Sequence, residues 1–390
     1  MRKNIGIYVH IPFCTRRCGY CDFLTFAHLE HIHQPYTSAL VKEIEKCEEL
    51  EAYNITSIFF GGGTPTNLTP EMLTAIFTAL NKYHIDPNAE VTIESNPGTL
   101  SLTMLRTLKS LGVNRLSMGL QSWHNKTLKQ IERGHSREEF LQNFKHARKL
   151  GFDNINVDLI FSLPRLEGGV YSDKEAFALW YDTLRHVVAL KPDHISVYSL
   201  IIEEGTRFYT MEQKGQLILQ SEALDRRMYH FSQGYLKRKG YNQYEISNFA
   251  KPDKHCKHNL LYWQRGEYIG FGLGSSGFVG GHRQTNIRGL NKYIEVVNAP
   301  NYKRADVIET QTLIDKQEAM EEFMYLGLRC LEGISTSVFE TTFGEDIRDV
   351  FGEAIKSNLN NGLLIEEKNQ IRLTQMGLDI SNRVFSDFLS

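Results

Sequence analysis

A chain of 390 residues with 41% hydrophobic residues is long enough for one large globular domain and a smaller one. Its formal charge of −2 leaves no basic excess to neutralise phosphates, which argues against a nucleic-acid partner. No apolar stretch approaches a membrane span, and the apolar run after Met1 is too short for a secretory signal. We therefore expect a cytoplasmic protein.

Six short apolar or alternating segments predict β-strands, at residues 5–11, 57–62, 91–95, 114–120, 152–161 and 194–200. Segments with apolar residues at helical spacing lie between them, at 36–50, 71–83, 102–112, 138–151 and 175–191. Thr69-Pro70 and Ser101 are typical helix starts, and Gly112 and Gly151 are typical helix ends. The alternation predicts an α/β fold, a partial (βα)6 barrel of parallel strands with its helices outside.

The alternation fades after residue 203. A helix is predicted over 224–240, and a region rich in glycine and aromatic residues follows. Near the end of the chain, 363–374 is typical of a hairpin and 376–389 of a helix. We expect three parts: a barrel over 1–235, a connecting region over 236–305, and a small, mainly helical, winged-helix-like domain over 306–390.

Three cysteines follow the first predicted strand in a C-x3-C-x2-C cluster, Cys14, Cys18 and Cys21. Thiolates clustered in a long intracellular chain favour zinc or an iron–sulfur cluster over disulfides. A structural zinc site needs four protein ligands, and His10 or His28 could supply the fourth. The other hypothesis is a [4Fe–4S] cluster that three cysteines hold, with one iron open to an exogenous ligand.

The cysteine spacing, with Tyr20 before the last cysteine, resembles the radical SAM superfamily. The resemblance implies a [4Fe–4S] cluster whose open iron binds S-adenosylmethionine (SAM). The GGGTP segment, which begins at Gly61, resembles the segment of that family that lies along the methionine amino group. Alone it would be an ordinary strand-to-helix turn, but its position at the end of the second predicted strand favours the family interpretation.

Further motifs resemble the oxygen-independent coproporphyrinogen III oxidase group and its HemW-type haem-chaperone relatives, over nearly the whole chain. The residues that the resemblance places in a SAM pocket are Tyr8, Gly62, Gly63, Thr64, Glu94, Gln121, Arg133 and Asp158. The carboxylates of Glu94 and Asp158 suit ribose hydroxyls or the methionine amine, and Arg133 suits a carboxylate.

Two departures favour the chaperone over the oxidase. Phe23 stands where the oxidase pattern has a further cysteine, and the chain begins almost at its first strand, without the N-terminal extension expected of the oxidase. The segment HNLLYW resembles the haem-binding motif of HemW-type chaperones, which implies haem contacts by His258, Asn259, Tyr262 and Trp263. An imidazole is a common axial ligand of haem iron, and aromatic rings offer flat apolar faces.

Other interpretations of these segments stay open. His255 and Cys256 are rival haem ligands, and HNLLYW could also be an aromatic loop that packs against the barrel mouth. The run GFGLGSSG is a weak match to a dinucleotide-binding fingerprint, because it does not open a strand–helix unit. Cys47 and Cys330 are predicted to be small buried residues in helical stretches.

The resemblance predicts a haem chaperone that binds haem and transfers it to acceptor apo-proteins, with a [4Fe–4S] cluster and SAM as cofactors. The alternative is a radical SAM oxidoreductase, the oxygen-independent coproporphyrinogen III oxidase. An electron donor is implied if SAM is cleaved. A peripheral membrane contact and a homodimer stay open.

Overall fold

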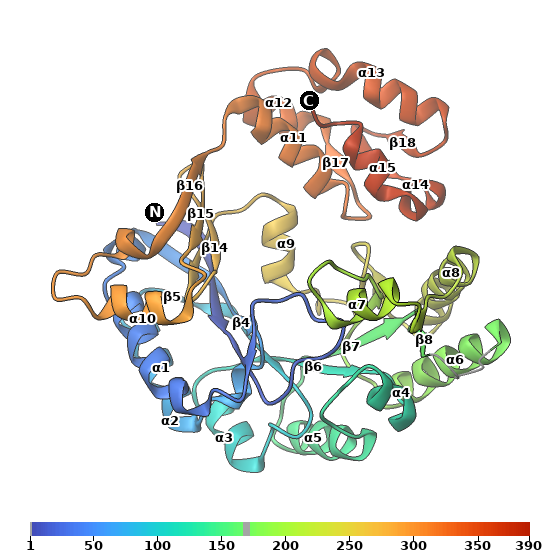
Figure 1. The fold of residues 1–390 in the computed structure, drawn as a ribbon. Coiled ribbons are helices and arrows are strands. Elements are labelled where there is room, and N and C mark those ends of the chain that lie inside the picture. The colour runs from blue at the N-terminus through green and yellow to red at the C-terminus, as the bar shows by residue number, and fades with distance from the viewer. Residues whose placement is uncertain (1, 167–171) are drawn as a thin grey trace.

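A computed structural model describes residues 2–166 and 172–390. Its main element is a sheet whose central six strands are all parallel and lie in the order β9-β7-β6-β5-β4-β1. These strands are β1 (Lys3–Ile11), β4 (Tyr53–Gly62), β5 (Ile85–Ser95), β6 (Arg115–Gln121), β7 (Ile155–Phe161) and β9 (His194–Ser199). All six predicted strands are therefore confirmed. Figure 1 shows the curved sheet of a partial barrel with helices along its outer side.

The barrel helices follow the predicted order, with one addition, α4, that the sequence patterns did not predict. They are α1 (Glu30–Glu45), α2 (Pro70–Leu80), α3 (Leu102–Ser110), α4 (Asn125–Gln130), α5 (Arg137–Lys149), α6 (Asp173–Ala189) and α8 (Glu222–Arg238). The side chains of Thr69 and Ser101 accept N-cap hydrogen bonds, and Gly112 and Gly151 have positive φ angles after α3 and α5. These predicted starts and ends are confirmed.

The first helix differs from its prediction at both ends. It begins at Glu30, before Pro35, because its first turns pack on the cysteine loop: the rings of His33 and Phe13 lie 4.2 Å apart. It ends at Glu45, and a 3-10 helix, η1 (Glu48–Ala52), follows. Cys47 is buried, as predicted, but lies between these two helices.

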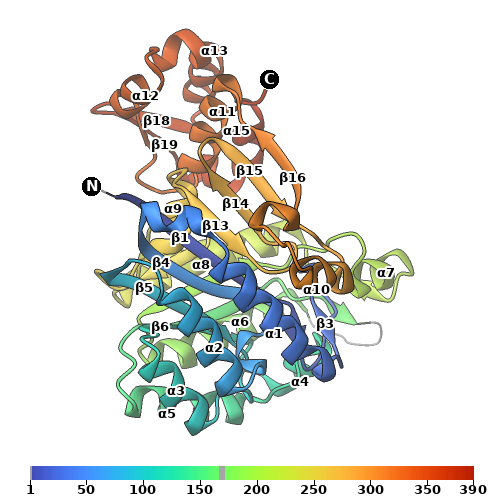
Figure 2. The ribbon, with the colours of Figure 1, turned by 90° about the vertical axis from the view of Figure 1, so that its left-hand side faces the viewer.

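The region after α8 extends both edges of the same sheet. At one edge β12 (Asn248–Ala250) pairs with β9, and β11 (Asn242–Gln243) pairs with β12. At the other edge β13 (Tyr268–Phe271) runs parallel to β1, and three antiparallel strands follow: β14 (Ser276–Val279), β15 (His282–Asn286) and β16 (Ile308–Leu313). Two helices belong to this region, α9 (Lys257–Trp263) and α10 (Leu290–Asn298). Figure 2 shows β15 and β16 leading from the barrel to the C-terminal part.

The C-terminal part is a mainly helical module with its own core. Its elements are α11 (Lys316–Gly327), β17 (Ile334–Ser335), α12 (Thr336–Phe343), α13 (Ile347–Asn360), β18 (Leu364–Glu367), β19 (Gln370–Leu373), α14 (Gln375–Asp379) and α15 (Ser381–Ser386). Phe339, Ile371 and Val384 are fully buried in this core. The hairpin β18–β19 and the winged-helix-like order are as predicted, but the last predicted helix is broken at Ile380, where φ is −126°.

Short elements close the loops around the barrel. The parallel pair β2 (Phe13–Cys14) and β3 (Phe26–Ala27) closes the cysteine loop, and β8 (Arg165–Leu166) pairs with β10 (Leu217–Ile218) near α7 (Arg207–Gln213). Two further 3-10 helices are η2 (Pro65–Asn67) and η3 (Arg304–Val307). Within the described residues, no helix is both long and apolar enough to cross a bilayer.

Candidate functional site

The three clustered cysteines lie in the loop that leaves the carboxyl end of β1. All three are free and half-buried. The Sγ atom of Cys14 lies 3.6 Å from Oγ1 of Thr64, and Nη1 of Arg133 donates to Sγ of Cys18 at 3.4 Å. The backbone amide of Cys21 donates to the carbonyl of Cys18 at 3.2 Å. Thr64, just after β4, and Arg133, after α4, therefore hold the cysteine loop at the barrel mouth.

The surroundings of Cys14 and Cys21 favour their protonated thiols. Burial raises the pKa of Cys14 to about 11, and the neighbouring Cys21 and Cys18 raise it further against the opposing effect of Thr64. Burial also raises the pKa of Cys21. A metal centre must displace these protons, so its assembly at this loop depends on pH.

The surroundings of His10 and His28, the two candidate fourth ligands of a zinc ion, help to decide between zinc and an iron–sulfur cluster. Nδ1 of His10 lies 3.0 Å from the Tyr8 hydroxyl and Nε2 lies 2.9 Å from the Leu24 carbonyl, so both ring nitrogens are engaged. His28 is exposed and has a φ of 61°. No three His, Cys, Asp or Glu side chains among residues 2–166 and 172–390 converge closely enough for a single metal ion. Three thiols without a fourth ligand fit a cluster, in which each cysteine binds a different iron, better than a zinc ion.

Two carboxylates face the barrel interior from β5 and β7, which β6 separates in the sheet. Oε2 of Glu94, near the end of β5, accepts a hydrogen bond from the Gly62 amide at 3.2 Å. Asp158 of β7 accepts hydrogen bonds from Ser117 at 2.9 Å and from Asn156 at 2.8 Å. Burial, and secondly the charge of Asp158, raise the pKa of Glu94 to about 8. A cationic ligand group would relieve this repulsion.

Arg133 joins the cysteine loop to the ends of β5 and β6. Its Nη2 donates to the Gly119 carbonyl at 2.6 Å and to Oδ1 of Asn96. The amide of Asn96 in turn donates to Oγ1 of Thr64 at 2.6 Å. The predicted residues Thr64 and Arg133 therefore meet through Asn96, which sequence reasoning missed. Asn96 follows Glu94 by two positions, and a polar residue at a strand's carboxyl end was the signal that could have found it.

Gln121 carries two observations that point to a ligand. Its φ of 68° is a left-handed conformation, which is uncommon for a residue other than glycine. Its Oε1 is buried and has no hydrogen-bond partner within the described residues. A buried acceptor without a donor is costly, and Oε1 of Gln121 is therefore available to a hydrogen-bond donor from outside the described residues.

The glycines of GGGTP have a role that the resemblance did not imply. The Gly63 and Thr64 amides donate to the carbonyls of Ile11 and Phe13, each at 2.8 Å. A Cβ atom on Gly63 would lie 2.7 to 2.9 Å from three backbone atoms of Ile11 and Phe13, and one on Gly62 would lie 2.4 Å from the His10 ring. These glycines let β4 approach the cysteine loop closely, which brings Thr64 to Cys14.

The HNLLYW segment forms α9, and its histidine is fully buried. Nδ1 of His258 lies 2.8 Å from Oγ of Ser57 in β4, and Nε2 lies 2.8 Å from the Tyr262 hydroxyl. The ring stacks on Phe59 with centroids 5.3 Å apart. Burial, with a smaller effect of Arg115, lowers the pKa of His258 to about 3, so the imidazole is neutral at physiological pH. In this arrangement no ring nitrogen of His258 is open to a haem iron.

The neighbours of His258 differ in exposure. Cys256 is buried, and its thiol donates to Oε1 of Glu90 at 3.4 Å. Asn259, Trp263 and His255 are half-buried. The structure therefore separates the predicted haem residues, with His258 in the barrel core and Trp263 at the outer end of α9.

Two other sequence features have structural roles. The GFGLGSSG run forms the end of β13 and the turn to β14, where the Gly272 amide donates to the buried Glu43 carboxylate at 2.9 Å. Cys330 lies after α11 in a β-bridge to Glu245 and is half-buried, so its prediction as a buried helical residue is wrong. The bridge draws it out of the helix and into the contact between barrel and C-terminal module.

Comparison with known proteins agrees with this geometry. Residues 8–167 match the radical SAM superfamily and residues 314–380 match the HemN C-terminal domain. The heme chaperone HemW of Bacillus subtilis is 36% identical over 98% of both chains, and that of Lactococcus lactis is 35% identical over 100% of this chain and 98% of its own. The coproporphyrinogen III oxidase HemN of Escherichia coli has a TM-score of 0.84 over 99% of this chain and 90% of its own; at 23% identity, this shows a shared fold.

A parallel partial barrel with a three-cysteine loop at the carboxyl end of its first strand defines a radical SAM protein. Similarity to curated relatives over the full length of the chain then assigns the protein to one family within this superfamily. The chain belongs to the family of radical SAM proteins whose curated members include the heme chaperones HemW.

Proposed function

We propose that this protein is a haem chaperone that binds haem and passes it to acceptor apo-proteins, with a [4Fe–4S] cluster and SAM as resident cofactors. The observation that carries the proposal is the similarity, over the full length of both chains, to relatives named heme chaperone HemW. The E. coli oxidase shares the fold at lower identity, and a shared fold does not imply a shared activity.

In this proposal Cys14, Cys18 and Cys21 hold the cluster, and the carboxyl ends of β1, β4, β5, β6 and β7 hold SAM. The donor set fits, because the thiols are free and lie beside Thr64 and Arg133. The SAM contacts are those of Tyr8, Gly62, Gly63, Thr64, Glu94, Gln121, Arg133 and Asp158. When bound, the cluster and SAM would supply one-electron chemistry that no side chain of the protein can perform.

The chain's own side chains would orient SAM by charge and hydrogen bonding. Glu94 and Asp158 offer carboxylates to an amine or to ribose hydroxyls, and Arg133 offers a cation to a carboxylate. Gln121 offers to a donor its Oε1, which has no hydrogen-bond partner within the described residues. Arg133 also donates to Cys18, so it would couple the position of SAM to that of the cluster loop.

The haem contacts of His258, Asn259, Tyr262 and Trp263 stay a prediction. Ligation by His258 would require its hydrogen bonds to Ser57 and Tyr262 to break. Phe23, at the position of the additional oxidase cysteine, is 63% exposed in the cysteine loop. Phe23 in place of that cysteine is a departure from the oxidase pattern and supports the chaperone proposal.

The test compares haem transfer with oxidase turnover on one preparation. Protein reconstituted anaerobically with iron and sulfide should bind haem, shown by a Soret band, and should pass it to an apo-protein separated by chromatography. The same preparation, given SAM, a reductant and coproporphyrinogen III, should form no protoporphyrinogen. Turnover of that substrate without haem transfer would establish the oxidase instead.

The cluster assignment has its own control. A triple Cys14→Ser, Cys18→Ser, Cys21→Ser variant should lose the broad iron–sulfur absorbance, whereas Cys47→Ser, outside the loop, should keep it. Stoichiometric zinc in the wild-type protein would contradict the assignment.

A further inference from the structure

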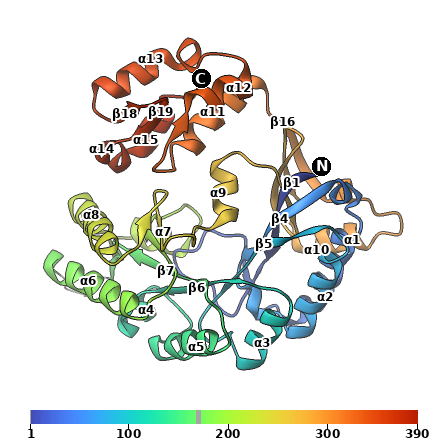
Figure 3. The same cartoon turned by 180° about the vertical axis from the view of Figure 1, so that it is seen from behind.

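A series of hydrogen bonds, here called the relay, crosses the barrel interior from the start of α9 to Asp158. The Cys256 amide donates to the Tyr244 hydroxyl at 3.2 Å, and that hydroxyl lies 2.8 Å from Nε2 of His194. Nδ1 of His194 lies 2.7 Å from Oδ1 of Asn156, whose Nδ2 donates to Oδ1 of Asp158 at 2.8 Å. Figures 1 and 3 show α9 from opposite sides, between the barrel and the C-terminal module.

Strand pairing places the inner members of the relay on one face of the sheet. His194 of β9 pairs with Asn156 of β7, and Asn156 pairs with Ser117 of β6. Asp158 follows Asn156 by two positions, and side chains two positions apart lie on the same face of a strand. Ser117 accepts from Asn156 at 2.8 Å and donates to Asp158 at 2.9 Å. The register of three strands therefore fixes the inner end of the relay.

The donor of each hydrogen bond in the relay can be assigned. A carboxylate only accepts hydrogen bonds, so the amide nitrogen of Asn156 faces Asp158 and its oxygen faces His194. Nδ1 of His194 therefore carries the proton. Burial, and secondly the charge of Arg115, lower the pKa of His194 well below its ordinary value, so the ring is neutral and Nε2 accepts. The Tyr244 hydroxyl is then the donor to Nε2.

Tyr244, near the outer end of the relay, is held by two further contacts. Its carbonyl accepts the Leu331 amide at 3.0 Å, beside the β-bridge between Glu245 and Cys330. Its ring stacks on that of His255, with centroids 4.3 Å apart. The relay therefore joins the contact between the barrel and the C-terminal module to a residue of the proposed SAM pocket.

The relay occupies space that apolar side chains fill in most barrels of this kind. Asn156, His194, Tyr244 and Cys256 are all buried. Buried polar groups are tolerated where each has its partner, and a satisfied network makes its members rigid. Every donor of the relay points toward Asp158, and hydrogen bonds in such a series polarise one another. Each oxygen of a carboxylate can accept two hydrogen bonds, so Asp158 keeps acceptor capacity for a ligand.

We propose that Tyr244 and His194 are positioning residues for SAM, which act through Asn156 and hold the Asp158 carboxylate in one orientation. The inference rests on the SAM site of the proposed function and does not involve haem. Loss of one link lets the carboxylate turn, and its contact with the amine or the ribose hydroxyls of SAM then weakens, because such contacts depend on fixed geometry.

The first test determines the tautomer of His194 in the full chain without cluster or SAM. With isotope-labelled histidine, long-range proton–nitrogen spectra should show a proton on Nδ1 of His194 and none on Nε2, and His194→Asn assigns the signals. Tyr244→Phe should change the Nε2 shift, because its donor is lost. Tyr241→Phe is the matched control: it removes another buried hydroxyl, which donates to the Pro192 carbonyl at 2.8 Å, and should leave these signals unchanged.

The second test measures the SAM affinity of cluster-loaded protein by equilibrium dialysis. Tyr244→Phe should weaken binding by about two- to thirtyfold, the range typical of substitutions within a coupled network. Tyr241→Phe should leave the affinity unchanged. His194→Asn should keep more affinity than His194→Ala, because its amide can still donate toward Asn156. Iron analysis of each variant confirms equal cluster loading.

The outcomes separate this inference from the function on which it rests. No SAM binding by the wild-type protein would overturn both the SAM site and the relay. Equal SAM affinity in the wild-type protein and Tyr244→Phe, or equal losses in Tyr244→Phe and Tyr241→Phe, would overturn the relay alone and leave the proposed function standing. A wild-type His194 with its proton on Nε2 would also overturn the relay alone.

Discussion

The carboxylates of Glu94 and Asp158 repel each other at the barrel mouth. Two carboxylates from nearby strands face one interior, and the repulsion adds to the burial that raises the pKa of Glu94. The hydrogen bond from Gly62 opposes this shift but does not cancel it. A site that holds an acid in its protonated form near neutral pH is poised to exchange that proton for a bound cation.

The affinity for SAM should therefore depend on pH through Glu94. Its pKa in the folded chain is about 8, above its ordinary value of 4.5, so it keeps its proton at pH 7 without ligand. A cationic ligand group favours the carboxylate, so binding releases a proton below pH 8 and tightens as pH rises toward 8. We expect the increase in melting temperature with SAM to grow from about pH 6.5 to about 8.5. Anaerobic scanning fluorimetry of cluster-loaded protein measures this.

Two variants provide the comparison. Glu94→Gln should flatten the pH dependence, because the amide does not titrate in this range. Glu353→Gln, an exposed substitution on α13, should keep it. An equally steep dependence in Glu94→Gln would show that another group, on the ligand or the protein, titrates instead.

The junction between β1 and β4 positions the cysteine loop. The two strands pair in parallel from Lys3 to Ile11, and the pairing continues past their ends through the Gly63 and Thr64 amides. This continuation fixes Thr64 against Cys14. Position 63 requires glycine, because a Cβ atom there would clash with three backbone atoms of Ile11 and Phe13.

Gly63→Ala should therefore damage the junction. The added methyl meets backbone atoms that cannot rotate away, and such overpacking typically costs about 1–3 kcal/mol of unfolding free energy. Iron incorporation should fall as well, since the cysteine loop loses its support. Gly352→Ala in α13 is the matched control: its nearest contact is 4.0 Å away, and alanine favours a helix, so the protein should be unchanged or slightly more stable. Urea unfolding and iron analysis test both, and equal effects of the two substitutions would refute the steric argument.

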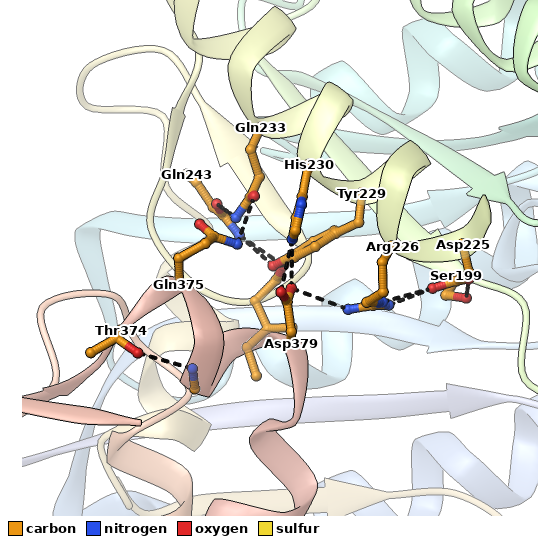
Figure 4. Close-up of polar contacts among 12 residues, drawn as sticks. Ser199, Asp225, Arg226, Tyr229, His230, Gln233, Gln243, Thr374, Gln375 and Asp379 are labelled. Atoms are coloured by element: carbon orange, nitrogen blue, oxygen red, sulfur yellow. Dashed lines mark hydrogen bonds and ion pairs between the residues drawn. The ribbon is translucent and has the colours of Figure 1, made fainter. Parts of the chain in front are cut away.

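Two of the polar contacts that join the C-terminal module to the barrel differ in burial. At one, Asp379 of α14 lies 2.7 Å from Nε2 of His230 and 3.7 Å from Nη1 of Arg226, both on α8 (Figure 4). At the other, the buried Glu322 of α11 accepts from Arg265 at 2.7 Å and from Arg283 at 2.6 Å. The groove lined by Trp263 and Val338 opens at this junction, so its shape depends on how firmly the module is held.

The two contacts should contribute unequally. Asp379→Asn weakens a partly exposed contact and should cost less than about 1 kcal/mol of unfolding free energy. Glu322→Gln leaves two arginines beside a buried neutral group and should cost about 2–3 kcal/mol, somewhat below the cost of breaking a fully buried pair, because Arg283 is partly exposed. Urea unfolding measures both, and hydrogen exchange shows whether α11 or α14 opens. A larger loss of unfolding free energy in Asp379→Asn than in Glu322→Gln would show that the Asp379 contact, and not the Glu322 contact, mainly holds the module to the barrel.

The sequence by itself determined the features that depend on residues close together in the chain. The alternation of strand and helix patterns, the caps at Thr69 and Ser101, and the glycine ends of α3 and α5 predicted the barrel, because each depends on residues a few positions apart. Cysteine spacing predicted the cluster loop for the same reason. The pocket residues from Tyr8 to Asp158 came from the family resemblance, and their assignment stays a prediction.

Tertiary structure decided the features that join distant segments. Asn96 bridges Thr64 and Arg133, α1 begins before Pro35 because it packs on the cysteine loop, and His258 is bonded to Ser57, 201 residues away. The motif pattern marked His258 for haem, but burial and hydrogen bonding depend on what packs around a side chain, which the local sequence does not contain. The groove lined by Trp263 and Val338 exists only because a separate module, folded around its own core, lies against α9.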